Sequence, residues 1–469
     1  MTAADGCDLD ELVTMRAHVM RGFFRSGASR ALNARRSALV RLRAQLKRNE
    51  DRILAALQSD LGKAPFEGYA TELGIVYDEI SFYLKHMEKW ARPRRVPTPL
   101  VHRPASSKVI PSPMGVVLVM SPWNYPLQLA LVPLVDAIAA GNCVAIKPSR
   151  TSPATGAVIA DIVSEAFDPG HACVFEGFDG MNERLLEEKW DLIFFTGSPA
   201  VGRTVMTAAA KHLTPVVLEL GGKSPCIVDA SARIPLAASR IAWGKGINSG
   251  QTCVAPDYLL VHESVVDQLV GELEKSFSRY YGSNALACGE WPRMVNERHF
   301  DRVCGLIDER GPACAIAFGG RRDRSTLKIE PTCMTGVSLS DPVMGEEIFG
   351  PVLPVLTYRT LDEAFDVVRS FEKPLAAYVF AEDESVCGRV LDELEFGGAT
   401  INDVVIHLAN NHMGFGGVGN SGMGSYHGKA GFDCFTHYKS TLKRATWMDV
   451  PVRNPPFGNK IKLVRMLMR

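Results

Sequence analysis

A carboxylate and a thiol lie near each other in residues 215–257. Glu219 ends an apolar run, a glycine pair follows it, and Cys253 comes after a helical segment, within Gln251-Thr252-Cys253. Covalent thiol catalysis needs a nucleophile and a proton acceptor, and these two side chains are of the required types. A buried strand end and a core cysteine would produce the same pattern, so the pair is a hypothesis that the rest of the chain must support.

The elements around this pair predict an α/β fold. Residues 8–90 show helical periodicity, and from residue 115 to residue 220 short β-rich apolar runs alternate with helical stretches. That alternation predicts a parallel sheet covered by helices on both faces. Residues 258–400 repeat it as a second α/β unit, and the prolines between residues 93 and 104 mark an extended segment before the first sheet.

Polar residues follow several predicted strands, where the ligands of parallel sheets bind. Asn124 comes after the run that ends at Met120, and it either caps the next helix or donates to an oxyanion. Lys147 ends another strand, and the glycine turn Thr196–Gly202 suits a dinucleotide close to the backbone. In Glu346-Glu347-Ile348-Phe349 an acid for ribose hydroxyls precedes an aromatic ring for a nicotinamide, and an ordinary loop before a strand explains the same residues.

Composition argues against several classes of function. The formal net charge is zero, and nucleic-acid binding needs an excess of Lys and Arg to meet the phosphates. The eleven cysteines contain no Cys-x-x-Cys pair, which predicts reduced thiols in a cytoplasmic protein. His407 and His412 have no third ligand nearby in the sequence, so we expect no metal site.

No transmembrane segment is expected. The longest apolar tract, Leu127–Ile146, contains Pro133, Asp136 and Gly141, which divide it into a helix and a strand. The tail from Asn454 mixes cations with apolar residues, and it suits contact with its own chain, with a partner subunit or, peripherally, with a membrane surface.

Six motifs, in this order along the chain, resemble the aldehyde dehydrogenase superfamily: PWNYP, KPS, FTGSPAVG, LELGGKSP, GQTC and EEIFGPV. The resemblance covers nearly the whole chain. The run INDVVIHLANNHMGFGGVGNSGMGSYHGK, together with an N-terminus that lacks a long extra arm before the helices, is similar to the class 3 branch of that superfamily.

The resemblance implies a role for each motif residue. Cys253 would be the nucleophile that forms a thiohemiacetal and then a thioester, Glu219 the general base that activates water, and Asn124 an oxyanion donor beside the Cys253 backbone N–H. The implied cofactor is NAD or NADP, and the implied cofactor residues are Trp123, Lys147, Gly197, Ser198, Gly202, Glu347 and Phe349.

Arg150 departs from the family pattern. It stands three residues after Lys147, where many family members have a glutamate that binds ribose hydroxyls and disfavours a 2′-phosphate. A guanidinium can pair with that phosphate, which slightly favours NADP. The alternative is that Arg150 points to solvent while Ser152 caps the helix that Pro153 starts.

Together these observations predict NAD(P)-dependent oxidation of a hydrophobic aldehyde, of medium or long chain or aromatic, to a carboxylic acid. The alternatives are a non-catalytic protein on the same fold and an enzyme that passes the acyl group to coenzyme A. Class 3 members are typically dimers, which implies a homodimer. The predicted parts are a Rossmann-like parallel-sheet cofactor domain (1–91 and 112–220), an α/β catalytic domain (221–420), a small β bridging and oligomerisation segment (92–111 and 421–450) and a tail (451–469).

Overall fold

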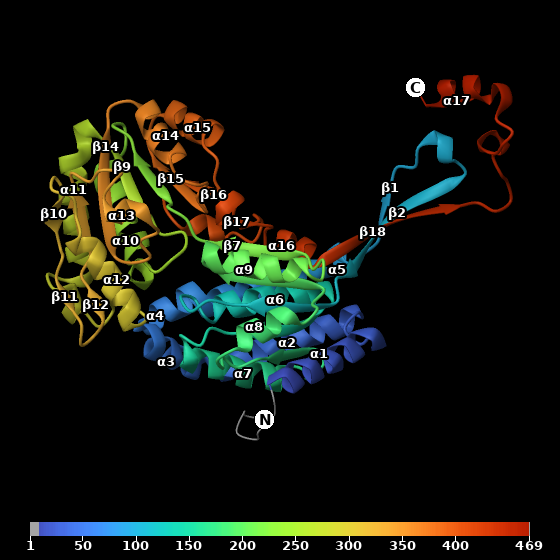
Figure 1. Cartoon of the computed structure of the whole chain (residues 1–469), viewed down its shortest axis with the longest axis horizontal. Coiled ribbons are helices and arrows are strands. Elements are labelled where there is room, and N and C mark those ends of the chain that lie inside the picture. The colour runs from blue at the N-terminus through green and yellow to red at the C-terminus, as the bar shows by residue number, and fades with distance from the viewer. Residues whose placement is uncertain (1–8, 469) are drawn as a thin grey trace.

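The computed structural model describes residues 9–468, whose strands form two large sheets, a small antiparallel sheet and a short hairpin (Figure 1). Residues 1–8 of the predicted cofactor domain and Arg469 of the predicted tail lie outside the described residues. The predicted alternation of strands and helices around parallel sheets is confirmed.

The first large sheet has the strand order β17-β7-β6-β3-β4-β5. Its strands are parallel except for β17, and β3 and β4 are buried along their whole length, as expected where helices cover both faces. β17 runs antiparallel to β7 and pairs Gly422 with Glu219. The strands are β3 (Val116–Met120), β4 (Cys143–Lys147), β5 (Ala172–Val174), β6 (Leu192–Gly197), β7 (Val216–Leu220) and β17 (Gly422–Met423).

Helices pack on this sheet and on one another (Figure 1). α6 is buried at every position, which explains why its apolar residues show no single face. The helices of this unit are α1 (Leu9–Ser26), α2 (Leu32–Arg48), α3 (Glu50–Leu61), α4 (Pro65–Gly68), a π-helical turn (Tyr69–Leu73), α5 (Gly74–Trp90), α6 (Gln128–Ala140), α7 (Pro153–Ala166), α8 (Met181–Glu187), α9 (Pro199–Ala210) and α16 (Gly428–Cys434).

The start of α7 corrects one detail of the sequence analysis. Ser152 occupies the N-cap position and Pro153 begins the helix, but the Ser152 side chain makes no capping hydrogen bond. Asp60, at the end of α3, takes that role, because its carboxylate accepts the N–H groups of Ala154 (3.2 Å) and Thr155 (2.8 Å). A residue distant in sequence therefore satisfies the first turn of this helix.

The second large sheet has the order β10-β13-β14-β9-β8-β15-β16 and is parallel except where β10 meets β13. Its strands are β8 (Pro225–Val228), β9 (Tyr258–His262), β10 (Ala315–Phe318), β13 (Thr332–Thr335), β14 (Val352–Tyr358), β15 (Ala376–Phe380) and β16 (Gly398–Ile401). Its helices are α10 (Ile234–Gly246), α11 (Val266–Tyr281), α12 (Glu297–Asp308), α13 (Pro342–Gly345), α14 (Leu361–Arg369) and α15 (Glu384–Glu393), and the hairpin joins β11 (Arg322–Asp323) to β12 (Lys328–Ile329).

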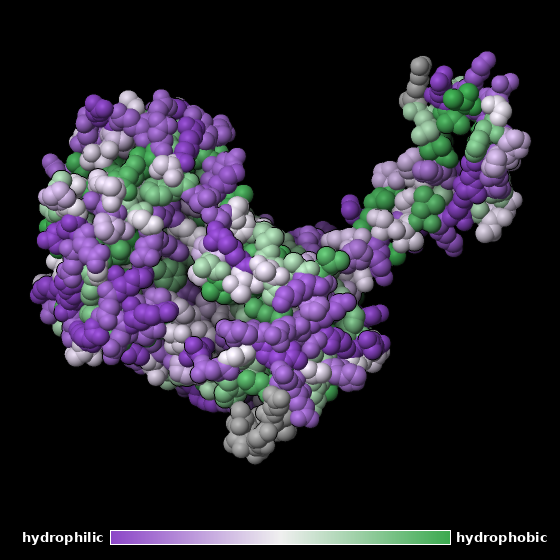
Figure 2. Space-filling model, in the orientation of Figure 1, coloured by the Kyte–Doolittle hydropathy of each residue, from purple (hydrophilic) through white to green (hydrophobic). Residues whose placement is uncertain are grey.

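The small sheet, of order β1-β2-β18, projects away from the two large units (Figure 1). It consists of β1 (Arg94–Val96), β2 (Ala105–Pro113) and β18 (Thr436–Arg444), so the extended segment predicted from its prolines pairs with a C-terminal strand of the same chain. Beyond it, the tail carries α17 (Ile461–Leu467). Apolar residues lie on the surface of this projecting part (Figure 2), among them Trp447, Phe457 and Met466.

Two findings bear on the expected environment of the chain. The ten cysteines within residues 9–468 are all free thiols. In the same range, no helix combines the length and the apolar character that crossing a membrane requires.

Candidate active site

Glu219 and Cys253 are in contact. Glu219 lies in β7 and is 2% exposed, and Cys253 follows the 3-10 turn Ile247–Gly250. The Cys253 thiol donates to Glu219 Oε1 (3.2 Å), and the Tyr426 hydroxyl donates to Glu219 Oε2 (3.3 Å). The structure therefore brings together the two residues that the sequence analysis singled out, and it adds Tyr426, which no motif spacing connects to them.

Burial dominates the electrostatics of this pair. Burial raises the pKa of the Glu219 carboxyl, and hydrogen bonds from Cys253 and Tyr426 oppose that rise. Burial and then the Glu219 carboxylate raise the pKa of the Cys253 thiol well above its usual value. With these neighbours alone the thiol holds its proton, so a reactive thiolate needs an added cation or further hydrogen-bond donors.

Asn124 lies in the loop between β3 and α6, in the wall of a cavity that also contains Cys253. Its Nδ2 atom donates to the Gln251 carbonyl (3.2 Å), and an amide nitrogen has a second hydrogen to donate elsewhere. Asn124 does not cap α6, because the Glu72 carboxylate accepts the N–H of Leu127 (2.8 Å) at that helix start. The structure therefore contradicts the capping role considered for Asn124, and its role as an oxyanion donor stays a prediction.

A cavity of about 320 Å³ lies beyond the carboxyl ends of β3, β6 and β7. Its wall mixes apolar side chains with Asn, Thr, Ser, His, Arg and Glu side chains, and for these it is called the polar cavity. Strand ends of a parallel sheet and the start of a helix, here α9, are where dinucleotides bind. The Phe349 and Trp123 rings meet edge to face in its wall, with centroids 5.4 Å apart. The predicted site residues that line it are Trp123, Asn124, Gly197, Ser198, Glu219, Cys253, Glu347 and Phe349.

Three predicted cofactor residues lie outside that lining. Lys147 is buried at the end of β4, where burial and then the charge of Arg150 lower the pKa of its ammonium to about 8. The Arg150 side chain is 63% exposed and pairs with Asp179. Gly202 lies in α9, where a Cβ would stand 2.8 Å from Leu220 Cδ2, so the packing of this helix on β7 explains the glycine.

Glu347 lies over the glycine turn that follows β7. A Cβ on Gly221 would overlap the Glu347 carboxylate, so a larger residue there would displace that side chain. Burial, and then the charge of Asp257, raise the pKa of Glu347 to about 8. Arg302 donates to the carbonyls of Glu347 (3.3 Å) and Ile348 (2.6 Å) and so holds this loop. The sequence analysis missed Arg302, because its position depends on where α12 packs.

An apolar cavity of about 160 Å³ lies on the other side of Cys253. The residues that it shares with the polar cavity are Glu219 and Cys253. An adjoining cavity of about 400 Å³ shares four wall residues with the apolar one: Ala70, Thr71, Trp243 and Ile247. The remaining apolar wall includes Ile75, Tyr125, Leu129, Val254, Val405, Ile406, Leu408, Ala409, Phe415 and Tyr426.

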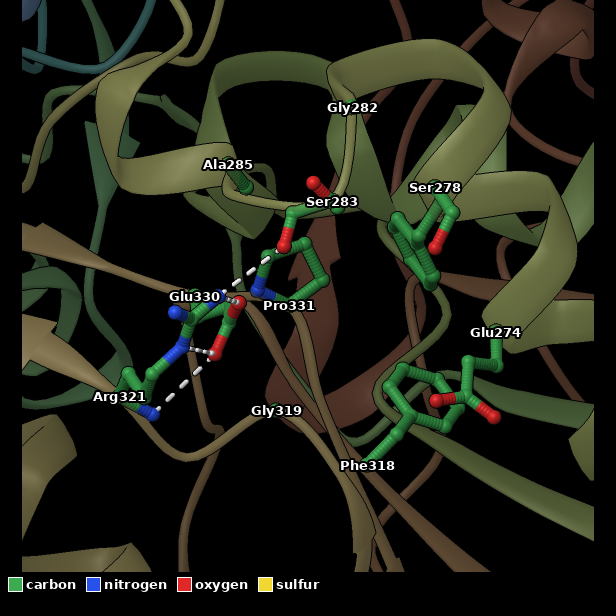
Figure 3. Close-up of a pocket in the computed structure, with 11 residues that line it drawn as sticks. Glu274, Ser278, Gly282, Ser283, Ala285, Phe318, Gly319, Arg321, Glu330 and Pro331 are labelled. Carbon is green, nitrogen blue, oxygen red and sulfur yellow. Dashed lines mark hydrogen bonds and ion pairs between the residues drawn. The ribbon is translucent and has the colours of Figure 1, made fainter.

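A further cavity is lined by none of these residues. This cavity, of about 240 Å³, lies between α11 and β10 (Figure 3), where Arg321 pairs with Glu330 and donates to the Ser283 carbonyl (3.1 Å). None of the predicted site residues lines it. Within residues 9–468, no group of three or more His, Cys, Asp or Glu side chains is arranged to hold a metal ion.

Comparison with known proteins places these residues in a family context. The model of the aldehyde dehydrogenase family matches residues 13–441. The chain is 43% identical over 451 residues to aldehyde dehydrogenase family 3 member H1 of Arabidopsis thaliana. The aligned region covers 96% of this chain and 93% of that protein. The chain is also 44% identical over 425 residues to a protein of Rattus norvegicus named aldehyde dehydrogenase, dimeric NADP-preferring, with 91% and 93% of the two chains covered.

A solved structure agrees with this comparison. The substrate-bound state of Staphylococcus aureus AldH superposes on the chain with a TM-score of 0.95 at 43% sequence identity. The superposition covers 97% of this chain and 99% of that one.

Proposed function

The chain belongs to the aldehyde dehydrogenase family and is an NAD(P)-dependent aldehyde dehydrogenase, and on this premise we propose which residues oxidise the aldehyde and how. Family membership confirms the predicted family, its class 3-like branch and the α/β fold, and it sets aside a purely non-catalytic role. The observation that carries the proposal is the junction of the polar and apolar cavities at Cys253 and Glu219. A cofactor on one side and an aldehyde on the other would meet there.

In this mechanism Cys253 is the nucleophile. Once the thiol proton has left to solvent, the sulfur bonds to the aldehyde carbon as a thiolate, which gives the oxyanion of a thiohemiacetal and leaves Glu219 as a carboxylate. The Asn124 amide and the Cys253 backbone N–H hold the oxyanion. One such donor contributes about 3 kcal/mol to the transition state, or roughly a hundredfold in rate.

The polar cavity suits a dinucleotide, because it lies beyond the carboxyl ends of parallel strands with Glu347 in its wall, and Lys147 ends the neighbouring strand β4. Lys147 and Glu347 would hold ribose hydroxyls, Gly197 and Ser198 would lie by the pyrophosphate, and Phe349 and Trp123 would contact the nicotinamide. When bound, NAD(P)⁺ supplies the hydride acceptor that turns the thiohemiacetal into a thioester. Glu219 then removes a proton from the water that hydrolyses the thioester, which releases the acid and restores the thiol.

We propose that the substrate is a hydrophobic aldehyde of medium or long chain, or an aromatic one. The cavity beside Cys253 is walled by aliphatic and aromatic side chains, and the adjoining cavity of about 400 Å³ extends it. Each buried methylene of the substrate is worth about 0.8 kcal/mol. Longer chains should therefore bind more tightly until both cavities are filled.

The projecting sheet suggests a homodimer. Within the described residues, β18 is paired on one side by β2, and its other edge is free to pair with another chain. The relative from Rattus norvegicus is named dimeric.

In the tail, exposed Ile461, Leu463 and Met466 alternate with cations, which suits peripheral contact with an anionic membrane surface.

We expect kcat/KM to rise along the series propanal, hexanal and decanal, by about tenfold or more overall, because of the methylenes buried in the apolar cavity. The measurement is NAD(P)H absorbance at several aldehyde concentrations. A specificity constant that is flat or that falls with chain length would contradict the proposed substrate class. Because the assay contains no coenzyme A, turnover in this series would also show that coenzyme A is not required.

Glu219→Gln should slow thioester hydrolysis far more than hydride transfer. The carboxylate raises the pKa of Cys253, so its removal favours the thiolate, whereas the water then lacks its base. A pre-steady-state burst of NAD(P)H should therefore survive while steady-state turnover falls by about a hundredfold or more. If the burst disappears together with turnover, Glu219 is instead the activator of the thiol. Cys253→Ser should show neither burst nor turnover.

Arg150→Glu should shift cofactor preference from NADP toward NAD. The positive charge of Arg150 lowers the pKa of Lys147, so Arg150 lies close to the expected ribose site. A carboxylate at position 150 would repel a 2′-phosphate bound there. The ratio of kcat/KM for NADP to that for NAD should fall about tenfold or more. The matched control is Asp179→Asn, which frees Arg150 and should preserve the NADP preference. The proposed role of Arg150 would be contradicted if the wild-type enzyme greatly prefers NAD and if Arg150→Glu leaves that preference unchanged.

A chain shortened after Val450 should remain a dimer and lose affinity for anionic vesicles, because the projecting sheet is retained and the basic, apolar tail is removed. Light scattering should give about twice the 51.2 kDa of one chain for the full-length protein and a correspondingly dimeric mass for the shortened one. Flotation with phosphatidylserine vesicles should recover the full-length chain alone. A monomeric full-length protein would refute the dimer, and equal flotation would refute the membrane contact.

A further inference from the structure

A buried ion pair lies behind the loop that carries Asn124. Lys63 Nζ and Glu72 Oε1 are 2.5 Å apart, and both side chains are completely inaccessible to solvent. Lys63 follows α3 and Glu72 lies in the π-helical turn before α5, so both belong to the N-terminal helices. Taking two charges out of water is costly, and replacing such a pair with apolar residues is often neutral for stability. The contacts that the pair makes with other groups are therefore of interest.

Those contacts converge on residues 124–128. Lys63 Nζ donates to the Asn124 carbonyl (2.9 Å) and lies 3.9 Å from the centre of the Tyr125 ring. Glu72 Oε2 accepts the N–H groups of Leu127 (2.8 Å) and Gln128 (3.3 Å) at the start of α6. Lys63 thus binds the carbonyl of Asn124, and Glu72 binds the backbone N–H groups of Leu127 and Gln128.

The same carbonyl also connects the Asn124 loop to the Cys253 loop. Asn248 Nδ2 donates to the Asn124 carbonyl (2.8 Å) and to the Gln251 carbonyl (3.1 Å), which itself accepts from Asn124 Nδ2 (3.2 Å). Asn248 and Ser249 have left-handed backbone angles, with φ of 49° and 54°, which costs free energy that the surrounding bonds must supply. The Asn124 carbonyl therefore accepts hydrogen bonds both from Lys63 and from Asn248, and Asn248 belongs to the loop that leads to Cys253.

We propose that Lys63 and Glu72 are positioning residues that orient the Asn124 amide toward the oxyanion formed at Cys253. The inference rests on the proposed role of Asn124 as an oxyanion donor. Neither Lys63 nor Glu72 lines the polar or the apolar cavity, so both act through the peptide of residue 124 rather than on the substrate. Oxyanion donors must be preorganised, because a displacement of a fraction of an ångström weakens the hydrogen bond at the transition state.

Lys63→Met tests the proposal, because methionine fills similar volume but cannot donate. We expect kcat to fall about tenfold and KM for decanal to change little, since a transition-state interaction is lost. In an Asn124→Ala background, which by itself should lower kcat about a hundredfold, Lys63→Met should cost less than about twofold more. Losses that multiply in the double variant would show that Lys63 does not act through Asn124, and would overturn the proposal.

A second variant separates positioning from folding. Lys63→Met combined with Glu72→Gln removes both charges of the pair and retains an acceptor for Leu127 and Gln128. Its Tm should recover toward the wild-type value, while kcat stays as low as in Lys63→Met. A kcat that recovers with Tm would show a purely structural role and would also overturn the proposal.

Arg35 provides the matched control. It is a buried cation, 7% exposed, whose Nη1 atom donates to the Ala139 carbonyl (3.1 Å) at the other end of α6. Arg35→Met should lower Tm without lowering kcat. The outcomes distinguish the two levels of the argument: an Asn124→Ala variant with undiminished kcat would refute the proposed oxyanion role and the positioning with it, whereas independent losses at Lys63 and Asn124 refute the positioning alone.

Discussion

The contact between the Cys253 thiol and the Glu219 carboxylate is the interaction on which the rest of the structure depends. One partner belongs to the first sheet and the other to a loop that leads into the second, so the contact exists only when the two units close on each other. Glu219 is buried there and Cys253 is partly buried, and the loss of solvent raises the pKa of both groups. A thiol kept protonated in this way is protected from side reactions until a ligand changes its surroundings.

Buried lysines hold the loops around this contact. Lys63 donates to the Asn124 carbonyl, Lys245 to the Pro256 carbonyl (2.9 Å), and Lys223 to the Glu346 carbonyl (2.9 Å). Lys223 also pairs with Asp257, whose other oxygen accepts the Ile348 N–H (2.9 Å). Each cation thus binds a loop carbonyl, and the loops of Asn124, Cys253 and Glu347 are held by charges that take no part in the proposed reaction.

The two cavities on either side of the thiol differ in polarity for a structural reason. The polar one is lined by the turns that follow β3, β6 and β7 and by the loop of Glu347, and the apolar one by side chains of α5, α6 and α10 together with loop residues such as Val405 and Phe415. A dinucleotide needs hydrogen-bonding groups and a hydrophobic aldehyde needs apolar surface. Because Cys253 and Glu219 line both, the geometry confines the proposed reaction to the boundary between them.

The sequence alone determined what depends on local pattern: the alternation of strands and helices, the motif residues Cys253, Glu219, Asn124 and Glu347, and the family to which they point. The tertiary structure decided what depends on groups far apart in the chain. It showed that Asp60, and not Ser152, caps α7, and that helix packing accounts for Gly202. It also placed three side chains beside residues more than forty positions away: Tyr426, Arg302 and Lys63. Spacing along the chain carries no information on such pairs, because the closure of two sheets and the packing of helices bring them together. The carboxylate and the thiol could be named from the sequence, but only the fold could show them in contact.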